Sequence, residues 1–421
     1  MSFYNQVMKR LLLASILLLL LLLAACAPAA TPSPAPTVTP LPAVPIAPVT
    51  PETPTLTLWL PDWMALPDAA GSDSLHEIIA AFEKEKGVQV LIIPKLPRGK
   101  GGLLDALRTT KPVAPSVLPD IIALPFQDIP TATQGDLLQP LDALFPAQFL
   151  DDLYPFARQA SQVEDAWMTV PFVADFEHLS FQPAALSDPP VNWDIILSSR
   201  SQYAFPVGGA DSAWTDALLL HYLSAAPEGE TPNRNKDALR RQLDFYEALY
   251  RQGQVDESIL QINNPAGSWE QALQGAATLA ETTAHLWLGQ RGEATFLRFG
   301  PTPTSDSQAR YLIHGWAYAI ITADETHQSL AVDLINRLVK AQALADWSSQ
   351  AHVLPARRSS LQQWPRDDYR DFANEALENG FLMPEFTQDE SMTRSVHQAV
   401  RAVLSGEMTA DEAWQQAVSG W

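Results

Sequence analysis

A strand–helix–strand pattern close to residue 56 constrains the fold of this chain more than any other feature. Residues 56–60 alternate as a strand does and stop at Pro61. Ser74 and Glu77 form a capping box, and the apolar residues around and after it share one helical face as far as Lys86–Gly87. Residues 88–93 are a second apolar run. Strand, helix and strand within about forty residues make a βαβ unit, which predicts an α/β protein with parallel strands.

Similar signals continue to the end of the chain. Periodicity and caps predict a helical segment near residues 105–107, a strand at 120–124, helices at 212–220, 332–344 and 391–404, and a last helix with a capping box at Thr409–Glu412. No long proline-rich linker divides the chain after residue 55. A long chain without such a linker indicates two lobes that are joined by more than one crossing.

Residues 1–25 carry the features of an export signal. Lys9 and Arg10 precede an apolar run at residues 11–25, which is short for a membrane span. The run ends in Leu-Ala-Ala-Cys, which resembles the lipobox of bacterial lipoproteins, and Cys26 is the only cysteine of 421 residues. We therefore expect lipidation of Cys26 and anchoring at the outer face of the cytoplasmic membrane. An ordinary signal peptide with an incidental cysteine is the alternative.

The segment at residues 26–55 is rich in proline, threonine and alanine. Repeated proline removes backbone donors and favours an extended polyproline helix. The composition therefore predicts a semi-stiff tether between Cys26 and the folded region, and an unstructured spacer fits it equally well.

Composition and the lack of motifs favour a binding protein over an enzyme. The formal charge of −21 disfavours nucleic acid and anionic lipid headgroups as partners. No G-x-S-x-G elbow, H-E-x-x-H helix or C-x-x-C pair occurs, and the eight histidines are scattered, so we expect no catalytic residues, metal site or cofactor. The glycine-rich segment 98–102 lacks the spacing of a phosphate loop and reads as a surface loop.

Several segments then resemble, in order, the extracellular solute-binding proteins of ABC importers, in the sugar-type group that includes maltose-binding protein. The similar segments are Pro119-Asp-Ile-Ile with Gly135-Asp-Leu-Leu-Gln-Pro-Leu, Thr169-Val-Pro-Phe through Phe181, Leu273-Gln-Gly-Ala-Ala, Gly300-Pro-Thr-Pro with Gly315-Trp-Ala, and the C-terminal residues 403–413. Together they extend over nearly all of residues 56–421.

This resemblance implies a type II periplasmic-binding-protein-like fold of the α/β class. Two lobes, each a mixed, mainly parallel sheet flanked by helices, are expected to close on a solute about a hinge. Lobe one would contain residues 56–175 and 292–345, and lobe two residues 176–291 and 346–421. The implied partners are a small solute, expected from the resemblance to be a carbohydrate, and the permease subunits of an ABC importer. The lipid anchor implies the membrane as a further partner.

A sugar site needs aromatic rings for stacking and polar groups for hydroxyls. Asp62 and Trp63 follow the first strand, at the edge where open α/β sheets bind ligands. Phe126 and Asp128 follow the strand at 120–124, although Pro125 shifts the family pattern by one residue. Asp175 lies on the segment expected to cross between lobes. For Trp63 and Asp175, packing under a loop and a hinge acid bonded to backbone donors are the structural alternatives.

The remaining candidates come from the second half of the chain. Asp211 and Trp214 match a ligand loop of the family, or else cap and pack a helix. Glu281 and Trp287 follow the Gly275 segment, and the family's stacking position there falls on His285, two residues before Trp287. A further pair, Gly315 and Trp316, lets the backbone approach a ligand beside an indole, unless the indole is buried between the lobes.

Three functions remain open. The first is capture of a sugar or oligosaccharide for an ABC importer. The second is the same fold holding a polyamine or other cation through carboxylates and aromatic faces. The third, a surface glycoside hydrolase that uses two of these acids, has the least support.

Overall fold

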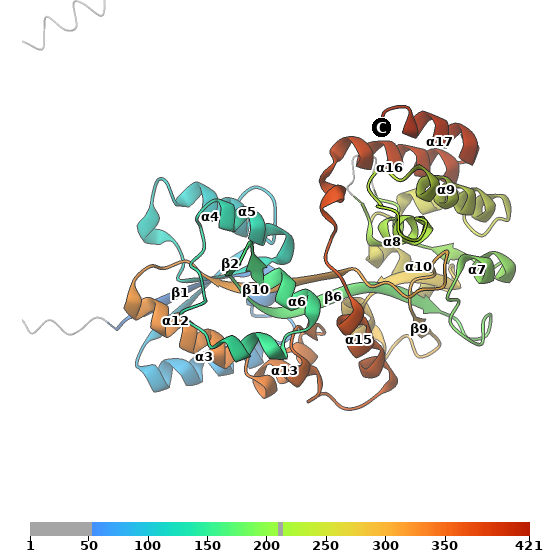
Figure 1. Ribbon diagram of the computed structural model, residues 1–421. Helices are drawn as coiled ribbons and strands as arrows, with labels where there is room; N and C mark the ends of the chain where they lie inside the picture. The colour runs from blue at the N-terminus through green and yellow to red at the C-terminus, as the bar shows by residue number, and fades with distance from the viewer. Residues whose placement is uncertain (1–52, 209–213) are drawn as a thin grey trace, which may run out of the picture. The chain divides into compact units, whose positions relative to one another are not determined.

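One strand, β6 (Val170–Phe181), pairs with different partners along its two halves. The computed structural model describes residues 53–208 and 214–421. Residues 170–176 of β6 pair with β10 (Ile313–Ile320), whereas residues 177–181 pair with β8 (Leu279–Thr283). Strand β6 therefore belongs to two neighbouring groups of strands. In Figure 1 it extends from the elements near α6 toward those near α10.

The main sheet has the strand order β2–β1–β3–β10–β6–β8–β7, with β9 and β11 also paired to β6. The pairing of β1 with β2 is parallel, which confirms the βαβ unit, and β1 with β3 and β7 with β8 are parallel too. The other pairings of this sheet in the described residues are antiparallel. The expectation of a mixed sheet is confirmed, but most of its pairings are antiparallel rather than parallel, because β6 and β10 run against their neighbours.

The bounds of the elements are as follows. The strands are β1 (Thr55–Pro61), β2 (Gln89–Lys95), β3 (Ile121–Pro125), β4 (Gln162–Val163), β5 (Ala166–Trp167), β6, β7 (Tyr203–Ala204), β8, β9 (Arg298–Gly300), β10 and β11 (Leu354–Pro355). The helices are α2 (Asp62–Ala65), α3 (Ser72–Lys86), α4 (Leu103–Thr110), α5 (Ile129–Gln134), α6 (Pro155–Ser161), α7 (Trp193–Ser199), α8 (Asp216–Ala225), α9 (Lys236–Arg251), α10 (Pro265–Leu273), α11 (Ala284–Gln290), α12 (Glu325–Leu338), α13 (Ala341–Gln350), α14 (Arg358–Leu361), α15 (Asp368–Asn379), α16 (Glu390–Leu404) and α17 (Ala410–Val418).

Helices cover both faces of the β1–β3 part of the sheet. Strand β3 shows the reason, because Ile121 and Ala123 belong to one hydrophobic core and Ile122 and Leu124 to another. Successive side chains of a strand point to opposite faces, so a strand buried on both faces needs cover on both. Helices α3, α12 and α13 pack together on one side, and α4 packs against β1 and β3. Elsewhere α8, α9, α16 and α17 form a second helical group (Figure 1).

Two predicted helices differ from the structure. Helix α3 begins at Ser72, so Ser74 makes no capping box; Gly71 turns with φ of 79° against Trp347 and starts the helix earlier. The helix expected at 332–344 is two helices, α12 and α13. The break falls at Val339, whose carbonyl accepts a hydrogen bond from the Arg357 guanidinium rather than from the next helical turn. By contrast, α16 and the Thr409 capping box of α17 are confirmed.

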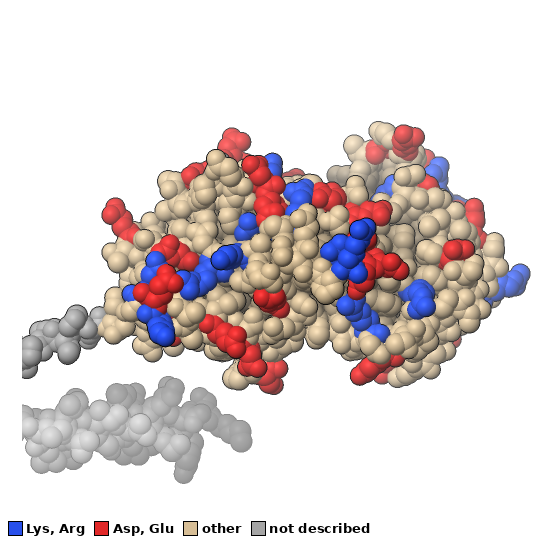
Figure 2. Space-filling view, turned by 90° about the horizontal axis from the view of Figure 1, so that it is seen from below, with Lys and Arg blue, Asp and Glu red and all other residues tan. Residues whose placement is uncertain are grey.

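The surface mixes both signs of charge. In Figure 2, acidic and basic side chains are interspersed over the visible face, although the whole chain carries a net charge of −21. Within residues 53–208 and 214–421, no helix combines the length and apolar character that crossing a bilayer requires.

Candidate functional site

Two of the predicted indoles meet in the structure. Trp63 lies in α2, directly after β1, and Trp316 lies in β10; β1 and β10 flank β3 on either side. The ring centroids are 5.7 Å apart and the planes make an angle of 67°, an edge-to-face contact. The Asp62 carboxylate accepts a hydrogen bond of 2.8 Å from the Trp63 backbone N–H and so fixes the turn into α2. Both indoles are only half-buried, so each keeps surface for a ligand.

Gly315 allows a close approach beside this pair. A Cβ atom at Gly315 would lie 2.2 Å from the Val173 carbonyl oxygen and 2.4 Å from the Phe126 ring. Only glycine has no Cβ in that space, which the buried ring of Phe126 occupies. The ring of Phe126 therefore supports β10 under Trp316 and offers little surface to a solute.

Asp128 and Arg98 form a charged edge near the indoles. Asp128 precedes α5 without capping it, and it is half-buried. Burial raises the pKa of Asp128, while the charge of Arg98 lowers it. The same guanidinium acts on His314 of β10. The loop at residues 98–102, expected to be plain surface, thus brings a cation into electrostatic range of this site.

Asp175 lies where β6 changes partner. It stands opposite His314 in the β6–β10 ladder, and its Oδ1 accepts hydrogen bonds of 3.0 Å from the backbone N–H groups of His285 and Phe176. Burial raises the pKa of Asp175, and His285 opposes that shift. The backbone hydrogen bonds are those of the structural alternative, and Asp175 is half-buried, so part of its surface remains exposed.

An Asp–His contact that the sequence analysis did not identify joins α8 to β10. The Nε2 atom of His314 lies 2.9 and 2.8 Å from the two carboxylate oxygens of Asp216. Asp216 is the first residue of α8, whose N-cap Thr215 accepts from the Leu218 N–H, while the expected start at residue 212 lies outside the described residues. The Thr215 cap was a readable signal for this start, but the 98-residue separation of the pair hid the contact.

Glu177 completes a group of neighbouring carboxylates. It follows Asp175 on the same face of β6, is 5% exposed, and its Oε2 has no hydrogen-bond partner among the described residues. Burial raises the pKa of Glu177 well above its usual range, and the charges of Asp216, Glu281 and Asp175 raise it further. Sequence reasoning missed this residue because its neighbours come from three distant segments.

Other predicted residues lie in the interior. Glu281 of β8 is fully buried, and its two oxygens accept hydrogen bonds from the Tyr203 hydroxyl (2.6 Å) and the Thr302 hydroxyl (2.7 Å). Trp287 is 5% exposed and stacks on Tyr369 at 5.7 Å. His285 of α11, in contrast, is exposed, and its backbone N–H donates to Asp175.

Trp214 is a packing residue, and two predicted positions are not described. The Trp214 ring is 9% exposed and packs on Tyr222 at 5.2 Å, which fits the helix-packing alternative. Asp211 and Cys26 lie outside the described residues.

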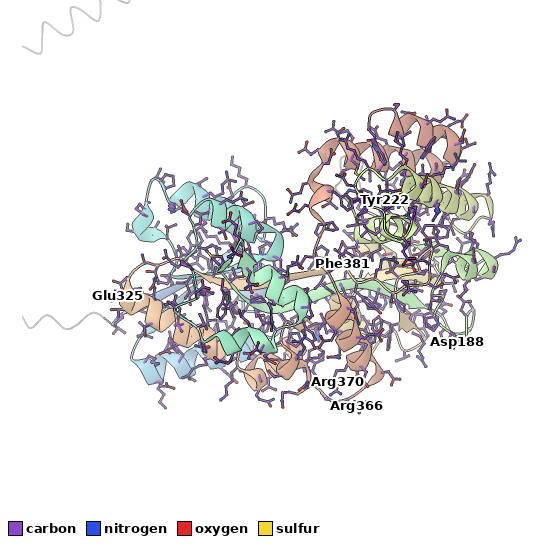
Figure 3. The ribbon with its side chains drawn as sticks, viewed as in Figure 1. Asp188, Tyr222, Glu325, Arg366, Arg370 and Phe381 are labelled. Atoms are coloured by element: carbon purple, nitrogen blue, oxygen red, sulfur yellow. The ribbon has the colours of Figure 1, made fainter. Side chains whose placement is uncertain are left out.

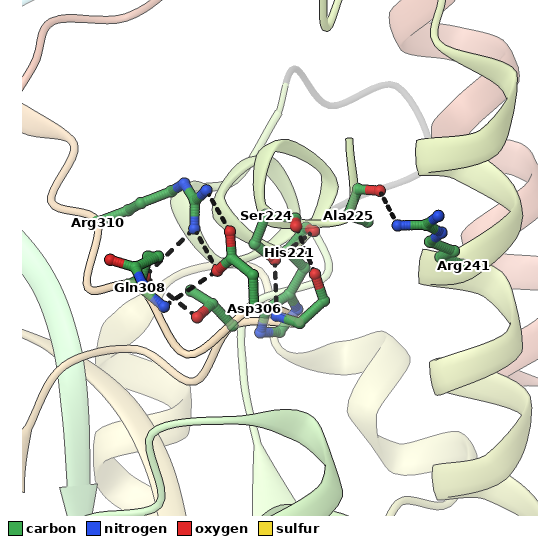
Figure 4. Close-up of polar contacts among 9 residues, drawn as sticks. His221, Ser224, Ala225, Arg241, Asp306, Gln308 and Arg310 are labelled. Carbon is green, nitrogen blue, oxygen red and sulfur yellow. Dashed lines mark hydrogen bonds and ion pairs between the residues drawn. The ribbon is translucent and has the colours of Figure 1, made fainter. Parts of the chain in front are cut away.

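A large hollow lies at the other end of α8. It has a volume of about 1340 Å³ and is lined by residues of α7, α9, the loop after α8 and the segment that carries Phe381. Figure 3 labels Phe381. Figure 4 shows its polar contacts: the Arg310 guanidinium is paired with Asp306, at 2.6 and 2.7 Å, and Arg241 donates to the Ala225 carbonyl. None of the residues predicted from the sequence lines it. Asp216 is seven residues along α8 from Leu223, which lines the hollow, or about 10 Å at helical rise.

The amino-acid sequence matches a known protein family over most of its length. Residues 77–374 match the family model described as bacterial extracellular solute-binding protein. The chain belongs to this family. The match confirms the resemblance stated from the sequence, and it includes Asp175, Asp216, His314 and Trp316, while Trp63 precedes it. No curated protein matches the chain.

As a bacterial extracellular solute-binding protein, the chain has a role in the capture of a small solute for an ABC importer. Proteins of this family are normally not enzymes, and export is typical of them. In the described part of the chain, no group of three or more histidine, cysteine or acidic side chains is arranged to hold a metal ion.

The buried Glu281 predicts how the stability of this solute-binding protein depends on pH. Burial raises the pKa of Glu281 to about 7, against the opposing hydrogen bonds of Tyr203 and Thr302. In the unfolded chain the carboxyl ionises near its ordinary value of 4.5, so folding disfavours ionisation. The stabilisation from neutral Glu281 is complete below pH 4.5, declines as the pH rises to about 7, and is absent above it. The loss is about 3 kcal/mol at 1.36 kcal/mol per unit of pKa.

Urea unfolding of wild type and Glu281→Gln at pH 4.5, 6 and 8 measures this. Glutamine keeps similar hydrogen bonds without a charge. The unfolding free energy of Glu281→Gln, relative to that of wild type, should therefore increase as the pH rises. Glu293→Gln, at an exposed position, is the control and should follow wild type at each pH. An identical pH dependence of wild type and Glu281→Gln would contradict the prediction.

Proposed function

We propose that this protein is an exported lipoprotein that captures a sugar or oligosaccharide and delivers it to the permease subunits of an ABC importer. The observation that carries the sugar assignment is the half-buried Trp63–Trp316 pair with polar groups beside it. Indole faces stack on the C–H faces of sugar rings, and carboxylates accept hydrogen bonds from hydroxyls. Asp128, Asp175 and His285 retain exposed surface for such contacts.

Glu281, Trp287, Trp214 and Phe126 have no part in this proposed site. Each is buried, and the surroundings of Glu281 and Trp287 already use their polar or aromatic surface. The proposed contacts are therefore Trp63 and Trp316 for stacking, Asp62, Asp128 and Asp175 for hydroxyls, and His285 at the position where the family's stacking residue is expected. Asp211 remains a proposal from the sequence.

The proposed mechanism is closure of two lobes about a hinge. The switch of β6 from β10 to β8 between Phe176 and Glu177 supports a boundary beside residue 175. Lobe one would be residues 56–175 with 292–345, and lobe two residues 176–291 with 346–421. A solute that contacts both lobes binds the closed form better, so it shifts the population toward that form, which the importer reads.

Titration calorimetry against a panel of mono- and oligosaccharides tests the sugar assignment. We expect at least one member to bind with a dissociation constant in the micromolar range or below, with no release of reducing ends from oligosaccharides on prolonged incubation. The absence of binding across the panel, together with tight binding of another solute class, would contradict it.

A cation is the second candidate solute, and a specific observation favours it. The charges of Asp175, Asp216 and Glu281 act on Glu177, and the Oε2 atom of Glu177 has no hydrogen-bond partner in the described part of the chain. An ammonium group would be attracted by these carboxylates and by the indole faces. Spermidine binding that sugars do not compete with would support this candidate over the first.

The anchor can be tested apart from the solute. Replacement of Cys26 with serine in the full chain removes the thiol that accepts lipid, so we expect incorporation of a labelled palmitate to stop and the protein to leave the membrane fraction. Ser33→Ala, in the proposed tether at residues 26–55, is the control and should keep both label and membrane association. Unchanged labelling of Cys26→Ser would show that lipidation is not at this cysteine.

A further inference from the structure

The Asp216–His314 pair connects the start of α8 to the strand that carries Trp316. Within the proposed boundaries, Asp216 belongs to lobe two and His314 to lobe one, so the contact crosses the hinge. The Nε2 atom of His314 is within 2.9 Å of both carboxylate oxygens, and the side chains are 36% (His314) and 10% (Asp216) exposed. A contact of this length with an ionised carboxylate is a strong, charge-assisted hydrogen bond when the imidazole is protonated.

His314 and Trp316 share a face of β10. They are two residues apart, and side chains at that spacing point to the same side of a strand. The ladder between β6 and β10 shifts register between Trp316 and Ala317, so regular pairing is interrupted directly after the indole. In addition to the backbone pairing of β10 with β3 and β6, this part of β10 is held by the packing of Phe126 beside Gly315 and by the contact of His314 with Asp216.

We propose that Asp216 is a positioning residue that, through His314, holds β10 and its indole Trp316 in place when His314 is protonated and releases them when it is not. The inference rests on the proposed function, because it assigns the indole to the solute site. The expected consequence is that solute affinity falls as the pH rises through the range in which His314 loses its proton.

The groups around the pair decide the sign of this dependence. Burial lowers the pKa of His314, but the carboxylate of Asp216 and then that of Asp175 outweigh burial, so the net shift of the pKa is upward, against Arg98. His285, on α11, faces Asp175 from the other side, and Glu281, on β8, acts on Glu177. The bond is therefore fully formed below the raised pKa of His314 and weakens as the pH rises through it.

A second Asp–His pair provides a matched control. His327 Nδ1 lies 2.8 Å from Asp120 Oδ1, with side-chain exposures of 33% (His327) and 11% (Asp120), close to those of the Asp216–His314 pair. It joins α12 to the residue before β3, and Asp120 also accepts from the Thr57 N–H. His327→Gln removes an equivalent imidazole without touching the strand that carries Trp316.

The first measurement needs no solute. Protein labelled with 5-fluorotryptophan is titrated from pH 5 to 9, and the fluorine resonance of residue 316 is assigned from its absence in Trp316→Phe. The H₂O–D₂O isotope shift of that resonance reports exposure of the indole to water. We expect this exposure to rise with pH in wild type and His327→Gln, and to be independent of pH in Asp216→Asn and His314→Gln. Exposure that does not change in wild type, or changes equally in Asp216→Asn, overturns the proposal.

The second measurement uses the sugar that binds most tightly in the panel described above. Its affinity should fall about tenfold between pH 6 and pH 8 in wild type and His327→Gln, which corresponds to one proton linked to binding over part of that range. Asp216→Asn and His314→Gln should vary by less than twofold. A wild-type profile that persists in both variants overturns the proposal. If no sugar binds while the fluorine titration behaves as expected, the sugar assignment fails and the positioning role of Asp216 stands.

Discussion

Replacement of Trp316 with alanine is expected to weaken solute binding about 30- to 100-fold. The indole is half-buried against Trp63, at 5.7 Å, and it is the largest aromatic surface that β10 offers to the proposed site. Truncation removes stacking area and also the partner that orients Trp63. Central aromatic residues of binding sites cost about 2 kcal/mol or more when they are cut to alanine, which is close to a 30-fold change in affinity.

Calorimetry with the tightest-binding sugar measures this effect, and Trp414→Ala provides the matched control. Trp414 is also a half-buried indole, but it lies in α17, where its Nε1 donates to the Lys236 carbonyl. Its loss should cost some stability and leave affinity unchanged. Trp63→Ala should weaken binding less than Trp316→Ala, because Trp316 lies on β10, which pairs with β6 beside Asp175, whereas Trp63 lies in the short helix α2. Unchanged affinity of a folded Trp316→Ala protein would remove this indole from the solute site.

Replacement of Gly315 with alanine is expected to destabilise the fold by about 3 kcal/mol. The new Cβ would lie 2.2 Å from the Val173 carbonyl oxygen and 2.4 Å from the Phe126 ring, so backbone and ring must both move. Forced overpacking of this kind costs about 1–3 kcal/mol and sometimes more. Because the clash involves a backbone atom of β6 as well as a side chain, we expect the upper end of that range.

Urea unfolding at constant pH measures the free energy of unfolding of Gly315→Ala, and Gly292→Ala is the control. A Cβ at Gly292 meets nothing within 4 Å, so alanine there should be neutral or slightly stabilising. The displacement of Phe126 in Gly315→Ala should also move Trp316, so solute affinity is expected to fall even where the variant remains folded. Equal stability of Gly315→Ala and wild type would show that β10 can shift without cost.

Local signals in the sequence were reliable where the deciding interactions are themselves local. The βαβ unit is confirmed by the parallel pairing of β1 and β2, and Gly87 ends α3 in the left-handed region with φ of 64°. The Thr409–Glu412 box caps α17 as expected. The two caps depend on residues within one helical turn, and the βαβ unit on consecutive segments of the chain, so the amino-acid pattern indicates these features.

Part of the site was also predictable, for a related reason. Trp63 and Trp316 follow from strand ends and from a glycine that permits close approach, and the structure brings the two indoles into contact. Trp287 is also a tryptophan, and Glu281 is also an acid, but both lie in the interior. Tyr369 covers Trp287 and Tyr203 covers Glu281, each from a distant segment of the chain. Composition and spacing do not distinguish a stacking indole from a buried one.

By itself, then, the sequence determined the α/β class, several element positions and the family resemblance, since these depend on patterns a few residues long. Tertiary structure alone decided that most pairings in the sheet are antiparallel, that α12 stops at Val339 where Arg357 reaches its carbonyl, and that Asp216 meets His314. The physical reason is that hydrogen bonds and charges act over a few ångströms whatever the separation along the chain. The partners in the last contact are 98 residues apart, and only the folded β10 and α8 bring them together.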